Sequence, residues 1–280
     1  MKIGNRNFNI GHTYIMGILN VTPDSFSDGG SFNSLDTALK HTEEMIKDGA
    51  DVIDIGGEST RPGYTRISET EEIERVAPVV EKIAQSFDIP ISVDTYKTEV
   101  AEEVLKKGAH LINDIWGLKG EEFIELENGT SRMAEIIAKA GASVCIMENV
   151  SKKVLETSVE TDICKRVLDN LLLSTEIALK SGIDEDKILL DPGVGFAKTY
   201  EDNLNTIKYL PQMCKKLKLP VLLGTSRKSV IGLTLDLDKS NRLEGTLATT
   251  AKAVEAGCMF VRVHDVKENY RFIKMIEAIM

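Results

Sequence analysis

The chain has 280 residues, 42% of them hydrophobic, and a formal net charge of −10, so it offers no broad basic surface for nucleic acid. No stretch approaches the roughly 20 consecutive apolar residues of a membrane span, and residues 1–12 lack the apolar core of a secretion signal. The four cysteines show no metal-ligand spacing, which favours a reducing cytoplasm: Cys145, Cys164, Cys214 and Cys258.

Short apolar, β-branched runs recur along the chain and predict eight strands. In chain order they are Tyr14–Leu19, Val52–Ile55, Ile91–Val93, Leu111–Ile112, Ser143–Met147, Ile188–Leu190, Val221–Leu223 and Met259–Val263. Segments with helical periodicity follow them: Leu35–Lys47, Glu69–Gln85, Thr98–Lys107, Met133–Ala140, Val159–Lys180, Leu204–Leu217, Leu243–Ala256 and Val266–Ile279.

The alternation of strand and helix predicts an α/β fold, a (β/α)8 TIM barrel. No linker or low-complexity tract divides the sequence, so we expect a single domain over residues 1–280. A doubly wound open sheet is the alternative architecture. Both architectures place functional residues at the carboxyl ends of the strands.

All the predicted strand ends carry polar residues. One of them alone has an ordinary interpretation as a helix cap, but their convergence on one face favours a site. Cationic or hydrogen-bond-donating groups suited to phosphate are Arg61, Lys228, Arg262 and His264. Groups suited to the edge of a flat heterocycle are Asp94, Asn113, Asp191 and Lys228.

One strand end stands out, because an apolar run stops at Asn20 and a long polar loop follows. The segment Met16–Gly30 reads MGILNVTPDSFSDGG, and its loop carries hydroxyls, carboxylates, glycines and the aromatic Phe26. An ordinary surface loop would explain this segment equally well by itself. Asn20 and the loop carboxylates are suited to Mg²⁺, a hard cation that keeps several waters and binds substrate phosphates.

Taken together, the motifs resemble those of the dihydropteroate synthase family over essentially the whole chain. The segments that carry the resemblance are Met16–Gly30, Asp54–Gly63, Ser92–Thr95, Asn113–Asp114, Asp191–Phe196, Ser226–Ser229 and Val261–Asp265. The resemblance implies a TIM barrel of the pterin-binding superfamily. It also implies condensation of 6-hydroxymethyl-7,8-dihydropterin diphosphate with p-aminobenzoate, which gives 7,8-dihydropteroate and pyrophosphate in folate biosynthesis.

The resemblance also implies a role for each residue of the site. The pterin ring would be bound by Thr60, Asp94, Asn113, Asp191 and Lys228. The diphosphate would be bound by Asn20, Arg61, Arg262 and His264, and Mg²⁺ by Asn20 and Asp28. The p-aminobenzoate pocket would be lined by Phe26, Pro62 and Ser226. The catalytic set would be Asp94, Lys228, Arg262 and His264. The family is usually homodimeric, through helices far from the rim of the barrel.

Two positions depart from the usual pattern of the family. Glu148 stands where the fifth strand usually ends in Met-His, and Ala197 stands where a glycine usually precedes Lys198. We expect Glu148 to face solvent. The segment Ser25–Asp28 runs without the insertion that the resemblance associates with sulfonamide-insensitive relatives, so we expect sulfonamides to compete with p-aminobenzoate.

Two alternative functions share parts of this pattern. Corrinoid-dependent methyltetrahydrofolate methyltransferases have the barrel and the pterin-binding carboxylates, but they need no diphosphate site. A non-catalytic pterin-binding paralogue would be expected to lose part of the loop or of the cationic set. The synthase is favoured over the methyltransferase by Arg61, by Lys228 in its Ser-Arg-Lys-Ser setting, and by Arg262 with His264. It is favoured over the paralogue because no part of the loop or of the cationic set is missing.

Overall fold

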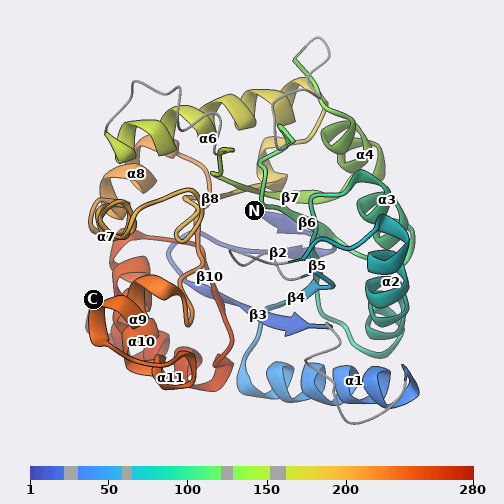
Figure 1. Ribbon diagram of the computed structural model, residues 1–280, viewed down its shortest axis with the longest axis horizontal. Coiled ribbons are helices and arrows are strands. Elements are labelled where there is room, and N and C mark those ends of the chain that lie inside the picture. The colour runs from blue at the N-terminus through green and yellow to red at the C-terminus, as the bar shows by residue number, and fades with distance from the viewer. Residues whose placement is uncertain (22–30, 59–64, 121–128, 152–161) are drawn as a thin grey trace.

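Parallel strands form a barrel at the centre of the molecule, and helices surround it (Figure 1). The structure is a computed structural model that describes residues 1–21, 31–58, 65–120, 129–151 and 162–280. The barrel strands are β3 (Tyr14–Asn20), β4 (Val52–Gly56), β5 (Ile91–Asp94), β6 (Leu111–Asp114), β7 (Ser143–Met147), β8 (Ile188–Asp191), β9 (Leu222–Leu223) and β10 (Phe260–Val263).

The order of the strands closes the sheet on itself. Neighbouring strands pair in the order β8-β7-β6-β5-β4-β3-β10-β9. A parallel bridge between Leu190 and Val221 then joins the two ends of this order. The closure confirms the predicted (β/α)8 barrel, because a doubly wound sheet would leave two open edges.

The strand register separates an apolar end of the barrel from a polar one. Asn20 is aligned with Gly56, Gly56 with Asp94, and Asp94 with Asn113, so polar residues of neighbouring strands lie together near the carboxyl ends. Apolar residues near the amino ends of the barrel strands form a cluster with residues of the N-terminal segment: Ile3, Phe8, Met16, Val52, Leu111, Cys145, Leu189, Leu222, Met259 and Phe260. The barrel therefore has an apolar core at the amino ends of its strands and polar side chains, suited to a functional site, at the carboxyl ends.

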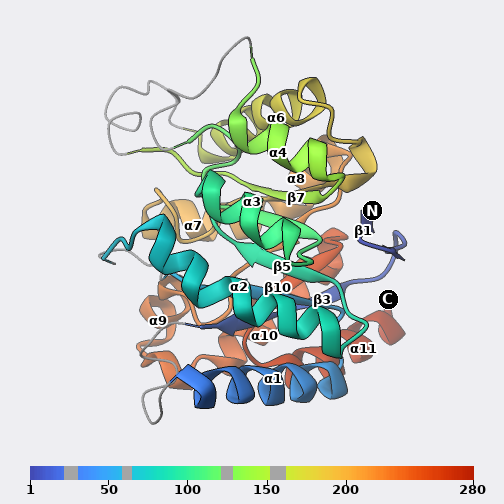
Figure 2. The same ribbon diagram turned by 90° about the vertical axis from the view of Figure 1, so that its right-hand side faces the viewer.

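A short N-terminal hairpin covers the amino-terminal end of the barrel, at the side where Figure 2 shows the N-terminus. It consists of β1 (Lys2–Ile3) and β2 (Arg6–Asn7). Phe8, which follows β2, packs edge-on against Phe260 with ring centroids 5.0 Å apart, and Ser143 Oγ donates to the carbonyl of Lys2 at 2.6 Å. The sequence patterns did not predict this hairpin, because its strands are too short to show an alternation.

Most of the surrounding helices of the described residues begin within a few residues of where the sequence predicts. They are α1 (Ser31–Asp48), α2 (Glu69–Ser86), α3 (Thr98–Lys106), α4 (Arg132–Ala140), α6 (Ile163–Lys180), α7 (Tyr200–Lys208), α8 (Leu210–Leu217), α9 (Ser229–Leu235), α10 (Leu243–Ala256) and α11 (Val266–Ile279). Capping serines explain two of the starts, because Ser68 and Ser131 each accept a backbone N–H of the first turn, of α2 and α4. Among the described residues, no helix is both long and apolar enough to cross a membrane.

Four helices differ from the prediction. The segment predicted as one helix, Leu204–Leu217, belongs to α7 and α8, because Pro211 in the first turn of α8 cannot donate the hydrogen bond that would continue α7. Helix α6 begins at Ile163 after its cap Asp162, and residues 159–161 of the predicted helix lie outside the described residues. Helix α9 was not predicted at all, because its seven residues are too few to show a helical period.

Candidate active site

The predicted site residues gather at the carboxyl ends of the barrel strands. Those in the described part of the chain lie in these ends or just past them: Asn20, Asp94, Asn113, Asp191, Ser226, Lys228, Arg262 and His264. The remaining predicted site residues lie outside the described residues: Phe26, Asp28, Thr60, Arg61 and Pro62. Seven residues of the first set fall into three groups, and the eighth is Asn20, at the end of β3.

The first group is built around Arg262, which links two buried carboxylates. Arg262 Nε donates to Asp54 Oδ2 at 2.6 Å, and Arg262 Nη2 donates to Asp94 Oδ2 at 2.7 Å. Asp54 also accepts hydrogen bonds from Ser92 Oγ and, at 3.4 Å, from Asn113 Nδ2. Side chains from β4, β5, β6 and β10 thus form one charged network inside the barrel.

Asp54 belongs to this network although the sequence analysis did not single it out. The sequence could have indicated Asp54, because it is the one charged residue in the apolar run that forms the fully buried strand β4. A buried charge needs a partner of opposite charge, and an acid in a buried strand therefore predicts a cation on a neighbouring strand. Burial alone would lower the pKa of the Arg262 guanidinium, but Asp54 and Asp94 raise it above its usual range.

Asp94 combines an ion pair with an unpaired oxygen. Its Oδ1 is buried and has no hydrogen-bond partner in the part of the chain that the structure describes. Burial raises the pKa of Asp94 to about 7; Arg262 opposes this rise and the nearby Asp54 adds to it. Buried polar atoms are nearly always hydrogen-bonded, so an oxygen left without a donor is suited to an N–H group of a ligand.

The second group surrounds Lys228 with the loop between β8 and α7. Lys228 Nζ donates to the carbonyl of Val194 at 2.5 Å and lies 4.8 Å from the ring centroid of Phe196. Burial lowers the pKa of Lys228 to about 8, against the raising effect of Asp191. Asp191 Oδ1 accepts the backbone N–H of Gly193 at 2.7 Å, and burial raises the pKa of this carboxyl.

The third group joins the ends of β9 and β10. Ser226 Oγ lies 3.0 Å from His264 Nδ1 and accepts the backbone N–H of His264 at 3.2 Å. The neighbouring Arg227 is engaged elsewhere, since its Nε donates to Asp265 Oδ2 at 3.0 Å. Ser226, which the resemblance assigned to the p-aminobenzoate pocket, is thus in direct contact with a residue assigned to the diphosphate.

Of the two predicted Mg²⁺ ligands, Asn20 lies within the described residues and Asp28 lies outside them. Asn20 ends β3 half-buried, and its Oδ1 lies next to Gly56, where an added side-chain carbon would be 3.8 Å away. The described residues contain no cluster of three or more His, Cys, Asp or Glu side chains that could hold a metal. One amide oxygen fits Mg²⁺ nonetheless, because this ion commonly takes one or two protein ligands and completes its shell with water and phosphate.

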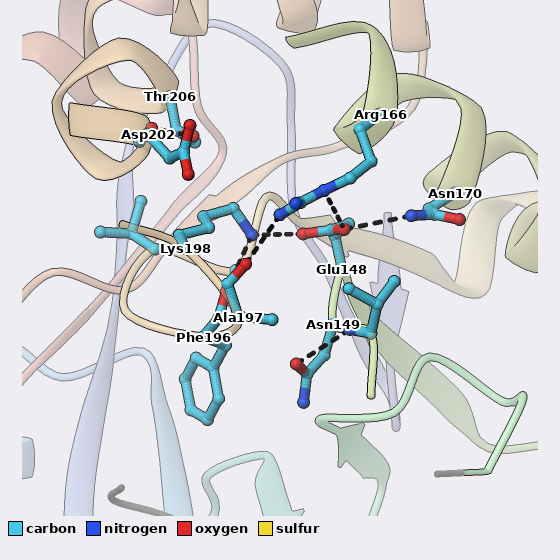
Figure 3. Close-up of polar contacts among 12 residues, drawn as sticks. Glu148, Asn149, Arg166, Asn170, Phe196, Ala197, Lys198, Asp202 and Thr206 are labelled. Carbon is cyan, nitrogen blue, oxygen red and sulfur yellow. Dashed lines mark hydrogen bonds and ion pairs between the residues drawn. The ribbon is translucent and has the colours of Figure 1, made fainter. Parts of the chain in front are cut away.

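Glu148 does not face solvent, and this prediction was wrong. It is fully buried just past β7, where it forms ion pairs with Lys198 and, at 3.5 Å, with Arg166. Asn170 Nδ2 donates to Glu148 Oε1 at 3.1 Å (Figure 3). The error arose because the partners come from α6 and from the β8–α7 loop, which the local sequence around Glu148 does not reveal.

Comparisons with known proteins agree with this architecture. A profile of the family described as "Pterin binding enzyme" matches residues 16–264. Dihydropteroate synthase of Clostridium beijerinckii is 51% identical over 282 residues, which cover 100% of this chain and 99% of the relative.

Solved structures give the same result. A crystal structure of dihydropteroate synthase from Clostridium difficile in the presence of pteroic acid has a TM-score of 0.89 and 49% identity, covering 98% of this chain and 99% of that chain. The Yersinia pestis enzyme with a sulfonamide drug complex has a TM-score of 0.88 and 40% identity, covering 100% and 98%. The chain therefore belongs to the dihydropteroate synthase family of pterin-binding enzymes.

Proposed function

We propose that this protein is a dihydropteroate synthase, a transferase that condenses 6-hydroxymethyl-7,8-dihydropterin diphosphate with p-aminobenzoate. The observation that carries the proposal is the unpaired buried oxygen of Asp94, held beside Arg262 at the carboxyl end of the barrel. This oxygen is suited to an N–H donor of a pterin ring. The full-length similarity to dihydropteroate synthases supports the same activity.

The pterin ring is proposed to bind between four described side chains, with Thr60 as a fifth contact. These four are Asp94, Asn113, Asp191 and Lys228. A pterin presents ring N–H groups and a carbonyl along one edge, so carboxylates can accept from it while an ammonium and an amide donate to it. The mixture of acceptors and donors in this set supports the assignment.

The diphosphate is proposed to lie beside Arg262 and His264, with Arg61 as a further cation. Arg262 donates to Asp54 from Nε and to Asp94 from Nη2. Its Nη1 has no hydrogen-bond partner among the residues that the structure describes, so it is available to a phosphate oxygen. Asn20 and Asp28 would hold Mg²⁺, which supplies positive charge to the leaving diphosphate when bound.

The chemistry follows from where charge develops. As the bond between the pterin methylene carbon and the diphosphate oxygen breaks, negative charge grows on the oxygen, and Arg262 with His264 stabilises it. Positive charge grows on the pterin, and the ionised form of Asp94 stabilises that charge. The amine nitrogen of p-aminobenzoate then attacks the methylene carbon, forms the C–N bond and releases one of its protons to water.

A homodimer is part of the proposal. Large apolar side chains are exposed on α6, α7 and α9: Leu172, Leu173, Leu179, Tyr200, Leu204, Leu233 and Leu235. Tyr200 Oη lies 2.9 Å from Thr234 Oγ1 and so links α7 to α9. Exposed apolar side chains on neighbouring helices support a subunit contact. Light scattering should give the mass of two chains, and a monomer at micromolar concentration would contradict this part.

The proposed location is the cytoplasm. All four cysteines are free thiols, and thiols persist in a reducing compartment. Fractionation of cells that produce the protein should place it with cytoplasmic markers.

The decisive experiment measures pyrophosphate release and dihydropteroate formation, with and without p-aminobenzoate and with and without Mg²⁺. We expect both products in equal amounts, and only in the complete mixture should dihydropteroate form. A methyltransferase or a protein that only binds pterins would release no pyrophosphate. Absence of both products in the complete mixture would overturn the proposal.

A further inference from the structure

A buried charge cluster lies against the β8–α7 loop, which also surrounds Lys228. This cluster takes no part in the chemistry above. Figure 3 shows the contacts among Glu148, Lys198 and Arg166. The side chains of Glu148 and Lys198 are fully buried, and that of Arg166 is 14% exposed. Glu148 accepts from Lys198 and from Asn170, and Arg166 Nε lies 3.5 Å from its Oε1. A carboxylate without solvent is tolerated only with such partners, so these residues form one unit.

The two cations of the cluster also bind the backbone of the β8–α7 loop. Lys198 Nζ donates to the carbonyl of Phe196 at 3.3 Å, and Arg166 Nη2 donates to the carbonyl of Ala197 at 2.9 Å. Ala197 adopts a φ of +45°, in the left-handed region that costs energy for any residue with a side chain. The cluster therefore holds this loop in a conformation that its sequence disfavours.

The same loop forms the surroundings of Lys228. The carbonyl of Val194 accepts from Lys228 Nζ, and the ring of Phe196 lies under that ammonium. Gly195 packs along the stem, where a side-chain carbon would approach Lys228 Cδ to 3.1 Å. Two residues thus separate Glu148 from Lys228 along the contacts, namely Lys198 and Phe196.

The backbone of Glu148 braces the loop as well. Its N–H donates to the carbonyl of Asp191 at 2.8 Å, and its own carbonyl presses on Gly193, where a side-chain carbon would lie only 1.9 Å away. Both ends of the loop segment 191–198 are therefore held by Glu148, one through its backbone and the other through its carboxylate.

We propose that Glu148 is a positioning residue, whose buried carboxylate acts through Lys198 and Arg166 to fix the loop that orients Lys228 toward the pterin. The inference rests on the proposed function, because it takes Lys228 as a pterin contact. It assigns a role to the acidic residue that stands where the family usually has histidine. A histidine at this position would not supply the carboxylate that pairs with Lys198 and Arg166.

The test compares Glu148→Gln, Lys198→Met and the double variant with the wild type. Glu148→Gln keeps the shape and leaves two cations unbalanced near Lys228. We expect the KM for dihydropterin diphosphate to rise about tenfold. The alkaline limb of the kcat/KM profile should move to lower pH by about half a unit, because uncompensated positive charge favours neutral Lys228. Binding of pteroic acid should weaken in parallel.

The double variant tests whether Glu148 acts through Lys198. If it does, Glu148→Gln changes the KM little further in the Lys198→Met background, so the two effects are not additive. Arg166→Met is the milder substitution if Glu148→Gln fails to fold. Among the contacts with described residues, it removes the hydrogen bond to Ala197 and the ion pair at 3.5 Å, and it should raise the same KM several-fold.

Glu72→Gln is the matched control, because Glu72 is another buried acid, 1% exposed, paired with the buried Lys97. It should lower thermal stability and leave the alkaline limb in place. If Glu148→Gln lowers only stability, with KM, pteroic acid binding and pH profile unchanged, Glu148 is merely structural and the inference is wrong. A wild-type enzyme without product formation would instead overturn the proposed function.

Discussion

One carboxylate oxygen of Asp94 accepts a hydrogen bond from Arg262, and the other has no donor among the described residues. Because this second oxygen is free for the pterin, substitution of Asp94 should reduce activity most. Asp94→Asn or Lys228→Ala should lower kcat/KM by roughly 10³-fold, because each removes charge directed at the reacting pterin. Both are rim positions, so the circular dichroism spectrum should stay that of the wild type. Turnover near the wild-type rate by either variant would contradict the proposed site.

The pH dependence of the reaction follows from the same two residues. Burial places the pKa of Asp94 at about 7 and that of Lys228 at about 8. As pH rises through 7 Asp94 gains its charge and activity should increase; as pH rises through 8 Lys228 loses its charge and activity should decrease. We therefore expect the kcat/KM profile of the free enzyme to be a narrow bell.

Asp51→Asn is a control that distinguishes the titration of Asp94 and Lys228 from general effects of charge on activity. Burial also raises the pKa of Asp51, but this carboxylate binds the backbone N–H of Ile15 at the start of the barrel, 2.8 Å away. Asp51→Asn should leave both limbs of the profile in place. A flat wild-type profile between about pH 6 and 9 would show that neither Asp94 nor Lys228 titrates in catalysis.

At the scale of elements, the β8–α7 loop depends on a close backbone approach. Gly193 has a φ of +68°, and a side-chain carbon there would lie 1.9 Å from the carbonyl oxygen of Glu148. Gly193→Ala should therefore lower the free energy of unfolding by about 3 kcal/mol or more, since strain and overlap add. Denaturant titration measures this change.

The control for this loop is another glycine of the same conformation. Gly141 ends α4 with a φ of +66°, but no atom lies within 4 Å of the position that a side-chain carbon would take. Gly141→Ala should cost only about 1 kcal/mol, the strain of the left-handed conformation itself. Equal losses for the two variants would mean that contact with Glu148 does not matter.

Element boundaries were predictable where the signal is local. The capping residue Ser68 lies directly before the predicted helix Glu69–Gln85, and Ser131 lies two residues before the predicted helix Met133–Ala140. The buried strands are apolar along most of their length. Helix α9 and the N-terminal hairpin escaped prediction because each is too short for a period to emerge. Their structures depend on packing against the barrel.

At the scale of the whole molecule, the p-aminobenzoate pocket is expected to form from separate rim segments. Of its predicted residues, Ser226 lies beside His264, and Phe26 and Pro62 lie outside the described residues. The sequence of Ser25–Asp28 lacks the insertion that the resemblance associates with sulfonamide-insensitive relatives. Sulfonamides should therefore inhibit this enzyme by raising the apparent KM for p-aminobenzoate at constant kcat. Full activity at saturating drug would contradict the predicted pocket.

Local sequence was enough to establish the barrel and the composition of its rim. Strand and helix periods are local properties, and parallel strands necessarily bring their carboxyl ends together, so Asp94, Asn113 and Asp191 could be assigned to one face. The order of the motifs along the chain then indicated the family.

Only the tertiary structure decides which charged side chains form ion pairs. Arg262 lies between Asp54 and Asp94, and Glu148 is buried between Lys198 and Arg166, although these partners are far apart in the chain. The state of an ionisable side chain depends on its neighbours in space and on its access to water, and local sequence contains neither. For this reason Glu148 was expected in solvent and was found in the interior.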